Sequence, residues 1–241
     1  MEYKDFERMV NEAEGRRFAP SISFPVLMRK VYTWMALAMV ITGLTAYSVA
    51  TTPALLEMIF GNRIVFFGLI IAELALVWGV SGMINRISLT TATLMFILYS
   101  VINGATLASI FLLYTMESIF HVFFITAGTF GVMALIGYTT KTDLTSMGKF
   151  LFMALVGLII ASLVNIFVGS SGLQSILSYV GVLIFVGLTA YDSQKIKYML
   201  ETQEYADEGA QKLALLGSLT LYLDFINLFI YLLRIFGSRR D

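Results

Sequence analysis

The sequence has little charge, and it lacks the residues that most catalytic and metal sites use. It contains no cysteine and only one histidine, which excludes disulfides, thiolate metal sites and sites with several histidine ligands. Only 13% of its 241 residues are charged, against about 25% in ordinary soluble domains. This shortage excludes a soluble globular domain and a disordered chain. The 16 basic residues balance the 16 acidic ones, so no net positive field favours a nucleic-acid partner.

What the chain does have is apolar sequence, since 58% of its residues are hydrophobic. A membrane-spanning helix needs roughly 20 predominantly apolar residues. Stretches of about that length or more, with at most one acid inside each, are 31–56, 64–85, 87–116, 118–140, 150–191 and 213–233. The stretch 150–191 is long enough for two spans, and the turn signal Gly169-Ser170-Ser171-Gly172 divides it. The sequence therefore predicts an all-α integral membrane protein with seven transmembrane helices.

The distribution of basic residues predicts the orientation of these helices. Nearly all basic residues outside the spans fall on the side of the amino terminus, whereas Arg63 is alone on the other side. We therefore expect a cytoplasmic amino-terminal tail at 1–26, a single transmembrane domain at 27–236 and a short carboxyl-terminal tail at 237–241.

The carboxyl terminus conflicts with this pattern. Seven crossings place it outside, together with Arg234, Arg239 and Arg240. Either this tail is an exception to a statistical bias, or the last helix does not cross fully. The side on which the chain ends stays open at this point.

Three acids, Glu73, Asp192 and Asp224, lie within or at the end of predicted spans. Ionisable side chains at such depth are costly and usually face the bundle interior or a wet path. In the last helix, residues spaced by four and three form one polar face: Thr220, Asp224, Asn227, Tyr231 and Arg234.

A purely structural role for these groups is the alternative. A protonated Asp224 that hydrogen-bonds Asn227 or a neighbouring helix needs no function beyond packing, and the same holds for Glu73. We interpret Asn103 and Asn165 as hydrogen bonds between packed helices.

We expect neither enzymatic activity nor a cofactor, because no nucleophile–base pair is visible. The sequence Gly79-Val80-Ser81-Gly82 offers a serine, and His121 is the only histidine. They belong to opposite ends of two spans, about 30 Å apart, far beyond hydrogen-bond reach.

Two runs of sequence, 190–196 (AYDSQKI) and 218–229 (SLTLYLDFINLF), resemble the Bax inhibitor-1 family (transmembrane Bax inhibitor motif proteins). The segment 140–144 (TKTDL) and the count of seven helices also fit. The resemblance covers about residues 27–236, and the bacterial branch is the most similar. It implies a multi-pass protein of the bacterial cytoplasmic (inner) membrane, with six helices wrapped around a central carboxyl-terminal helix.

The resemblance also implies a function, a pH-sensitive calcium leak channel controlled by two aspartates. These match Asp192 and Asp224, the family's acid in the second helix matches Glu73, and Arg86 is the candidate for a basic latch on the aspartate pair. Calcium is then the permeating ion, and the lipid bilayer is the surrounding partner. Some bacterial members are implicated in modulating a membrane-bound protease, so regulation of another membrane protein without flux is the alternative. A proton-coupled transporter of a small solute is a third possibility.

The chemistry of such a pair follows from its charge. Two carboxylates within hydrogen-bond reach share a proton, because both cannot ionise cheaply. Hard oxygen ligands suit calcium, so Asp192 and Asp224 are also predicted to bind it weakly and transiently, with Glu73 and Asn227 along the ion path. One difficulty is depth. Counted from Lys195 and Lys212 along the helical rise, the two aspartates differ in depth by about 13 Å. The pair forms only if the last helix begins well before Lys212 or if a vestibule admits water.

Overall fold

The structure is a computed structural model that describes residues 23–240. Within these residues, seven helices are long and apolar enough to cross a membrane. Most of the predicted tail 1–26 lies outside the described residues, and its last three residues belong to the first helix. The helices are α2 (Phe24–Thr51), α3 (Pro53–Phe60), α4 (Arg63–Met83), α5 (Leu89–Leu107), α6 (Ser109–Leu113), α7 (Met116–Thr139), α8 (Thr145–Val168), α9 (Ser171–Glu201) and α10 (Glu208–Phe236). Two apolar stretches of the sequence are each divided between two helices. The first is divided between α2 and α3, and the second between α5 and α6. The seven long helices confirm the prediction.

Two local signals explain where the helices break. Pro53 begins α3 because proline suits the first turn of a helix but cannot continue one, so α2 ends at Thr51 rather than near residue 56. Gly169 adopts a positive φ of 67° and ends α8, as the turn signal predicts. Asn165 serves this turn, because its side chain accepts a hydrogen bond of 3.1 Å from the Ser170 amide. Our interpretation of Asn165 as a link between helices was therefore wrong.

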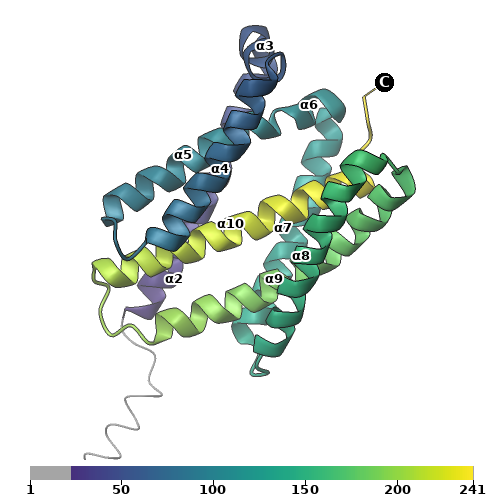
Figure 1. Cartoon of the computed structure of the whole chain (residues 1–241). Coiled ribbons are helices and arrows are strands. Elements are labelled where there is room, and N and C mark those ends of the chain that lie inside the picture. The colour runs from purple at the N-terminus through teal and green to yellow at the C-terminus, as the bar shows by residue number, and fades with distance from the viewer. Residues whose placement is uncertain (1–22, 241) are drawn as a thin grey trace, which may run out of the picture.

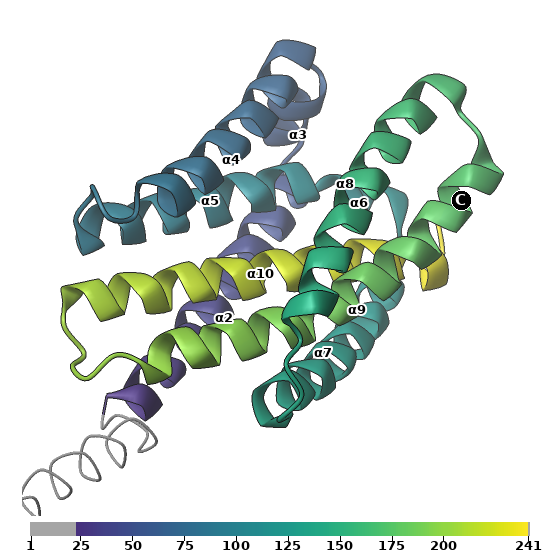
Figure 2. The ribbon, with the colours of Figure 1, turned by 60° about the horizontal axis from the view of Figure 1, so that its bottom comes forward.

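Helix α10 is the centre of the bundle (Figures 1 and 2). It packs against α9, α2, α7 and α5, while α4 packs on α5 and α8 packs on α9. Its buried side chains, such as Leu221 and Leu228, are inaccessible to solvent. The six other spans thus surround the carboxyl-terminal helix, four of them in direct contact, and α4 and α8 flank the gap beside it.

Close approaches between helices fix the position of α9. A side chain at Gly137 of α7 would collide with the backbone of Ala190, and one at Gly148 of α8 would collide with the ring of Tyr191. Small residues at helix contacts let membrane helices pack closely. Both contacts lie within two residues of Asp192, so α9 packs closely against α7 and α8 beside this acid.

Candidate ion site beside the central helix

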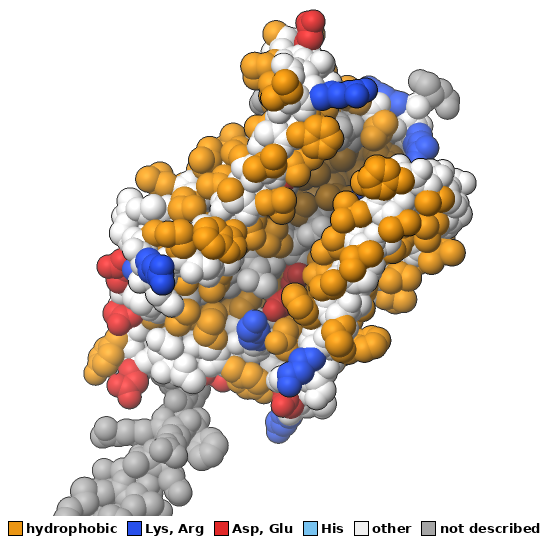
Figure 3. All heavy atoms as spheres, in the orientation of Figure 1, with side chains coloured by type: hydrophobic (Ala, Val, Ile, Leu, Met, Phe, Trp, Pro, Cys, Tyr) orange, Lys and Arg blue, Asp and Glu red, His pale blue; other side chains and the backbone are white. Residues whose placement is uncertain are grey.

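A cavity of about 1070 Å³ lies between α4 and α8, along one side of α10. Figure 3 shows the hollow on this face, with acidic side chains inside it and hydrophobic side chains along its rims. All the acids singled out from the sequence line it, namely Glu73, Asp192 and Asp224. The cavity is therefore the place where the predicted site is assembled.

Asp192 of α9 and Asp224 of α10 form a buried carboxyl pair. They are 9% and 4% exposed, and their side chains lie within hydrogen-bond reach of each other. Atom Oδ2 of Asp224 is buried, and no donor group in residues 23–240 reaches it. Since a bare carboxylate cannot donate, a proton on one carboxyl group is what turns this contact into a hydrogen bond.

The depth difficulty disappears because the two helices are long and staggered. Helix α9 runs past Lys195 to Glu201, and α10 already begins at Glu208, before Lys212. Asp224 lies farther from the start of α10 than Asp192 lies from the end of α9. The connection 202–207 accommodates this difference in helix length. The lysines therefore do not mark one plane.

The polar face of α10 points into the cavity over most of its length. Thr220, Asp224, Asn227 and Tyr231 all line it, whereas Arg234 lies in a different pocket near the end of the helix. The amide nitrogen of Asn227 donates to the Leu223 carbonyl at 2.8 Å. The predicted stripe is thus confirmed for four of its five residues as the wall of one cavity.

Glu73 reaches the same cavity from α4 but belongs to a different cluster. Its carboxylate accepts hydrogen bonds from Thr106 at 2.7 Å and from Asn103 at 3.4 Å. The Asn103 side-chain oxygen accepts from the Tyr222 hydroxyl at 2.9 Å, which also contacts the Thr42 hydroxyl at 2.6 Å. This chain, called the Tyr222 network below, links α4, α5, α10 and α2.

The Tyr222 network confirms that Asn103 connects helices and shows what the sequence analysis missed. Thr42, Thr106 and Tyr222 belong to it, and no periodic signal distinguished them from other residues in apolar helices. Within residues 23–240, no group of three or more acids or histidines lies close enough to hold a metal ion. Glu73 therefore does not join the aspartate pair as a third ligand in this arrangement.

The basic residues beside the pair differ from the predicted one. Arg86 lies exposed in the turn after α4, lines no part of the cavity, and forms no ion pair within the described residues. Lys149 of α8 and Lys195 of α9 line the cavity instead, and Lys195 acts electrostatically on Asp192. In the sequence, the signal for this interaction was the spacing of three residues between Asp192 and Lys195 on the same helix. The role of Arg86 as a latch stays a prediction.

Gln194 joins two of the sequence runs that carry the family resemblance. Its amide donates to the Thr142 carbonyl at 2.8 Å, and its oxygen accepts from the Leu144 amide at 2.9 Å. The loop between α7 and α8 is thereby tied to α9, two residues from Asp192. In that loop, hydrogen bonds from Thr145 hold the pKa of the exposed Asp143 below its usual value.

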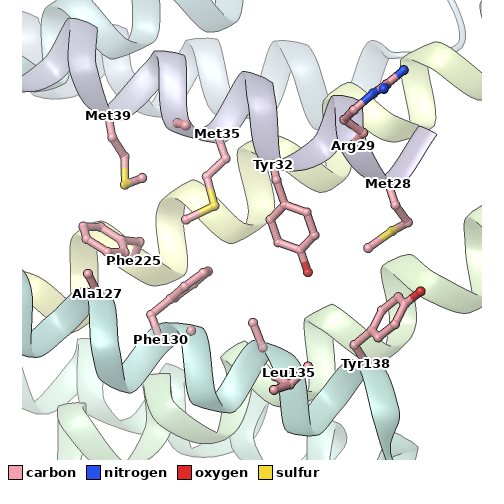
Figure 4. A pocket seen from close by; sticks show the side chains of 13 residues that line it. Met28, Arg29, Tyr32, Met35, Met39, Ala127, Phe130, Leu135, Tyr138 and Phe225 are labelled. Atoms are coloured by element: carbon pink, nitrogen blue, oxygen red, sulfur yellow. The ribbon is translucent and has the colours of Figure 1, made fainter. Parts of the chain in front are cut away.

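A second hollow, between α2 and α7, has no such chemistry (Figure 4). It measures about 580 Å³ and is walled by methionines of α2, by Phe130 of α7 and by Phe225 of α10. None of the described residues that line it is an acid. Of these two hollows, the cavity between α4 and α8 is the one that combines size with buried acids.

Comparison with known proteins gives consistent results. The family model described as "Inhibitor of apoptosis-promoting Bax1" matches residues 25–241. The Escherichia coli K12 "Inner membrane protein YbhL" is 50% identical over 222 residues, which cover 92% of this chain and 95% of that protein. An uncharacterized protein of Borreliella burgdorferi is 48% identical over 214 residues, covering 89% of this chain and 92% of that protein. An uncharacterized protein of Rickettsia prowazekii is 45% identical over 216 residues, covering 89% and 90%.

Proposed function

The chain belongs to the Bax inhibitor-1 family of membrane proteins, and on that premise we propose that it is a pH-sensitive calcium leak gated by Asp192 and Asp224. The observation that supports this most strongly is the buried Asp224 carboxyl group, which lies within hydrogen-bond reach of the Asp192 carboxyl group and whose Oδ2 atom has no donor within residues 23–240. We further propose the bacterial inner membrane as its location, with the amino terminus in the cytoplasm. The name of the Escherichia coli relative supports the membrane assignment.

The gate works through a change of charge on the pair. Near neutral pH the two carboxyl groups share one proton and carry one negative charge, which attracts a cation at the mouth of the cavity. Acidification adds a second proton and removes that charge. The pair then no longer holds the cation, and the helices around the cavity can separate. Lys195 is the cation beside the pair in the present arrangement, and Arg86 is the one that the family resemblance implies.

Calcium crosses weakly bound rather than trapped. Carboxylate oxygens suit calcium, but a tight site needs six to eight oxygen ligands. Two aspartates, with Glu73 and Asn227 along the same cavity, supply few of them, and a leak needs sites that release the ion readily.

The test is calcium flux into proteoliposomes from mildly alkaline to mildly acidic pH. The wild type is compared with Asp192→Asn and Asp224→Asn, which keep the side-chain volume and remove the titrating group. Asp143→Asn is the matched control, because this exposed loop aspartate has a lowered pKa and stays ionised over the range. We expect acid-stimulated flux in the wild type and control, and pH-independent flux in the other two variants.

Two outcomes contradict the proposal. If both pair variants keep the wild-type pH profile, another group is the sensor. If folded wild-type protein shows no flux above empty liposomes at any pH, the regulatory alternative becomes the better one, with a membrane-bound protease or another membrane protein as partner. The buried acids then serve only as packing groups.

A further inference from the structure

A small polar pocket lies at the far end of α10, close to the carboxyl terminus of the chain. It encloses about 190 Å³ between the first turns of α9 and the last turn of α10. Ser171, Gln174, Ser175, Ser178 and Tyr179 line it from α9, and Arg234, Ile235 and Arg239 line it from α10 and the tail. Among the described residues, two arginines and no acid line the pocket.

Neither arginine has a carboxylate partner in the described residues. The ion pairs found there are Lys197–Glu201, at the end of α9, and Lys212–Glu208, at the start of α10, both at the opposite end of the bundle. The guanidinium carbon of Arg234 lies 5.3 Å from the centre of the Tyr231 ring, an arrangement that orients the group without neutralising it. Two arginines therefore line one polar pocket, and no acid of residues 23–240 neutralises them.

The backbone of the tail is held in place, which fixes where the exposed Arg239 side chain begins. The Ser238 amide donates to the Ser118 hydroxyl at 2.8 Å, and the Thr115 amide donates to the Ser238 carbonyl at 3.1 Å. The Arg240 amide donates to the Leu113 carbonyl at 3.0 Å. The backbone of Arg239 forms an isolated antiparallel β-bridge with the backbone of Tyr114. These bonds fasten the tail to the turn between α6 and α7.

The ligand chemistry follows from the donors. A guanidinium group presents several N–H donors in a plane and matches the oxygens of a phosphate group. The side-chain amide of Gln174 has no hydrogen-bond partner within residues 23–240 and adds a further donor, while its backbone amide donates to the Ser170 carbonyl. The Ser175 and Ser178 hydroxyls donate to carbonyls of their own helix at 3.1 and 2.9 Å, so they supply polarity but no charge.

The surroundings indicate where such a phosphate comes from. Ile176, Tyr179 and Phe236, the large apolar side chains next to the pocket, are each about 60% exposed. The pocket lies where α9 begins and α10 ends, at the level where a spanning helix meets the headgroups. Arginines at the end of the bundle opposite the basic amino-terminal end run against the usual charge bias, and an anion bound there would compensate their charge.

We propose that this pocket binds the phosphate group of an anionic phospholipid, with Arg234 and Arg239 as its ligands. The acyl chains then lie along the exposed apolar side chains of α9 and α10. The site is independent of the aspartate pair, and it ties a lipid to the end of the helix that carries Asp224.

The experiment measures phosphatidylglycerol binding to the detergent-purified, full-length protein by native mass spectrometry. The wild type is compared with Arg234→Gln, Arg239→Gln and the double variant. Arg240→Gln is the matched control, because it removes the same charge from the same tail, while the Arg240 guanidinium donates to the Phe111 carbonyl at 3.0 Å and does not line the pocket. Elution on size exclusion verifies that each variant is folded.

We expect each pocket variant to weaken binding about tenfold, the loss of one charge-assisted hydrogen bond, and the control to change it less than about twofold. Phosphatidylcholine, which has no net charge, is expected to bind more weakly to the wild type. Equal losses in all single variants would overturn the site in favour of net charge alone. If inorganic phosphate displaces the lipid at equal concentration, the phosphate chemistry holds and a soluble anion, not a lipid, is the ligand.

Discussion

Tyr222 and Asp224 are both buried and lie two residues apart on α10. Their polar atoms differ in the hydrogen-bond partners that the protein gives them. The Tyr222 hydroxyl has two partners, Asn103 and Thr42, and belongs to a network that joins four helices. The Oδ2 atom of Asp224 has no donor within the described residues, and the Asp224 carboxyl group lies beside a second acid, Asp192. On the Tyr222 side of the helix, the protein itself supplies the hydrogen-bond partners. On the Asp224 side, a proton or a cation is needed to satisfy the carboxyl groups.

The difference separates packing from function. A buried polar group with partners contributes to stability, and one without them is costly unless something from outside satisfies it. A protein tolerates the second kind where the missing partner is part of the mechanism. The Tyr222 network is therefore expected to govern stability, and the aspartate pair to govern the response to pH.

The largest change in stability is expected from Tyr222→Phe. It leaves the Asn103 oxygen without its donor and removes the contact to Thr42, at a cost of about 1–2 kcal/mol in free energy of unfolding. Unfolding in mixed micelles with rising denaturing detergent measures this. Tyr99→Phe is the control, because the Tyr99 ring packs edge-on against the Tyr222 ring and its hydroxyl has no hydrogen bond in residues 23–240. A loss in the control as large as that in Tyr222→Phe would attribute the effect to removal of a hydroxyl group as such and not to the hydrogen bonds of the Tyr222 network.

Glu73→Leu is expected to cost somewhat less, about 1 kcal/mol, since it removes the acceptor of Thr106 and Asn103. The companion variant Glu73→Gln tests whether the carboxylate charge matters. A glutamine can accept from Asn103 and donate to the Thr106 oxygen, so its expected cost is below about 0.5 kcal/mol. If Glu73→Gln is as unstable as Glu73→Leu, the charge of Glu73 and not its hydrogen bonding supports the network.

Asp224→Asn is expected to have the opposite sign. The new amide donates to Asp192 and supplies the hydrogen bond that the pair makes only with a proton, so the protein gains up to about 1 kcal/mol at alkaline pH, where the wild-type pair has lost its shared proton. The same variant is expected to lose the pH dependence of flux. A clear loss of stability, measured as for Tyr222→Phe, would show that Asp224 is needed for packing and would remove the contrast between the two sides of α10.

The sequence predicts the side of α10 that carries the aspartate pair far better than the side that carries the Tyr222 network. Charge-free windows locate the helices because hydrocarbon leaves almost no alternative to them, and acids inside such windows stand out as Asp192 and Asp224 do. Thr42 and Tyr222 do not stand out, since hydroxyl residues occur throughout membrane helices and reveal a network only through contacts between helices. The turn at Pro53 and the stagger of α9 against α10 also depend on local geometry that hydropathy does not record.

The smallest effect is expected from Arg86→Gln, the variant that bears on the mouth of the cavity. Arg86 is exposed and has no ion-pair partner in residues 23–240, so its replacement is expected to change the free energy of unfolding by less than about 0.5 kcal/mol. Lys195→Gln removes the positive charge that acts on Asp192 in the cavity, and we expect it to shift the pH midpoint of calcium flux while Arg86→Gln leaves the midpoint in place. The reverse result has a definite meaning. A shift with Arg86→Gln alone would mean that the turn after α4 moves to the mouth in the closed state, and that the family-based latch, rather than the neighbouring lysine, holds the charged pair.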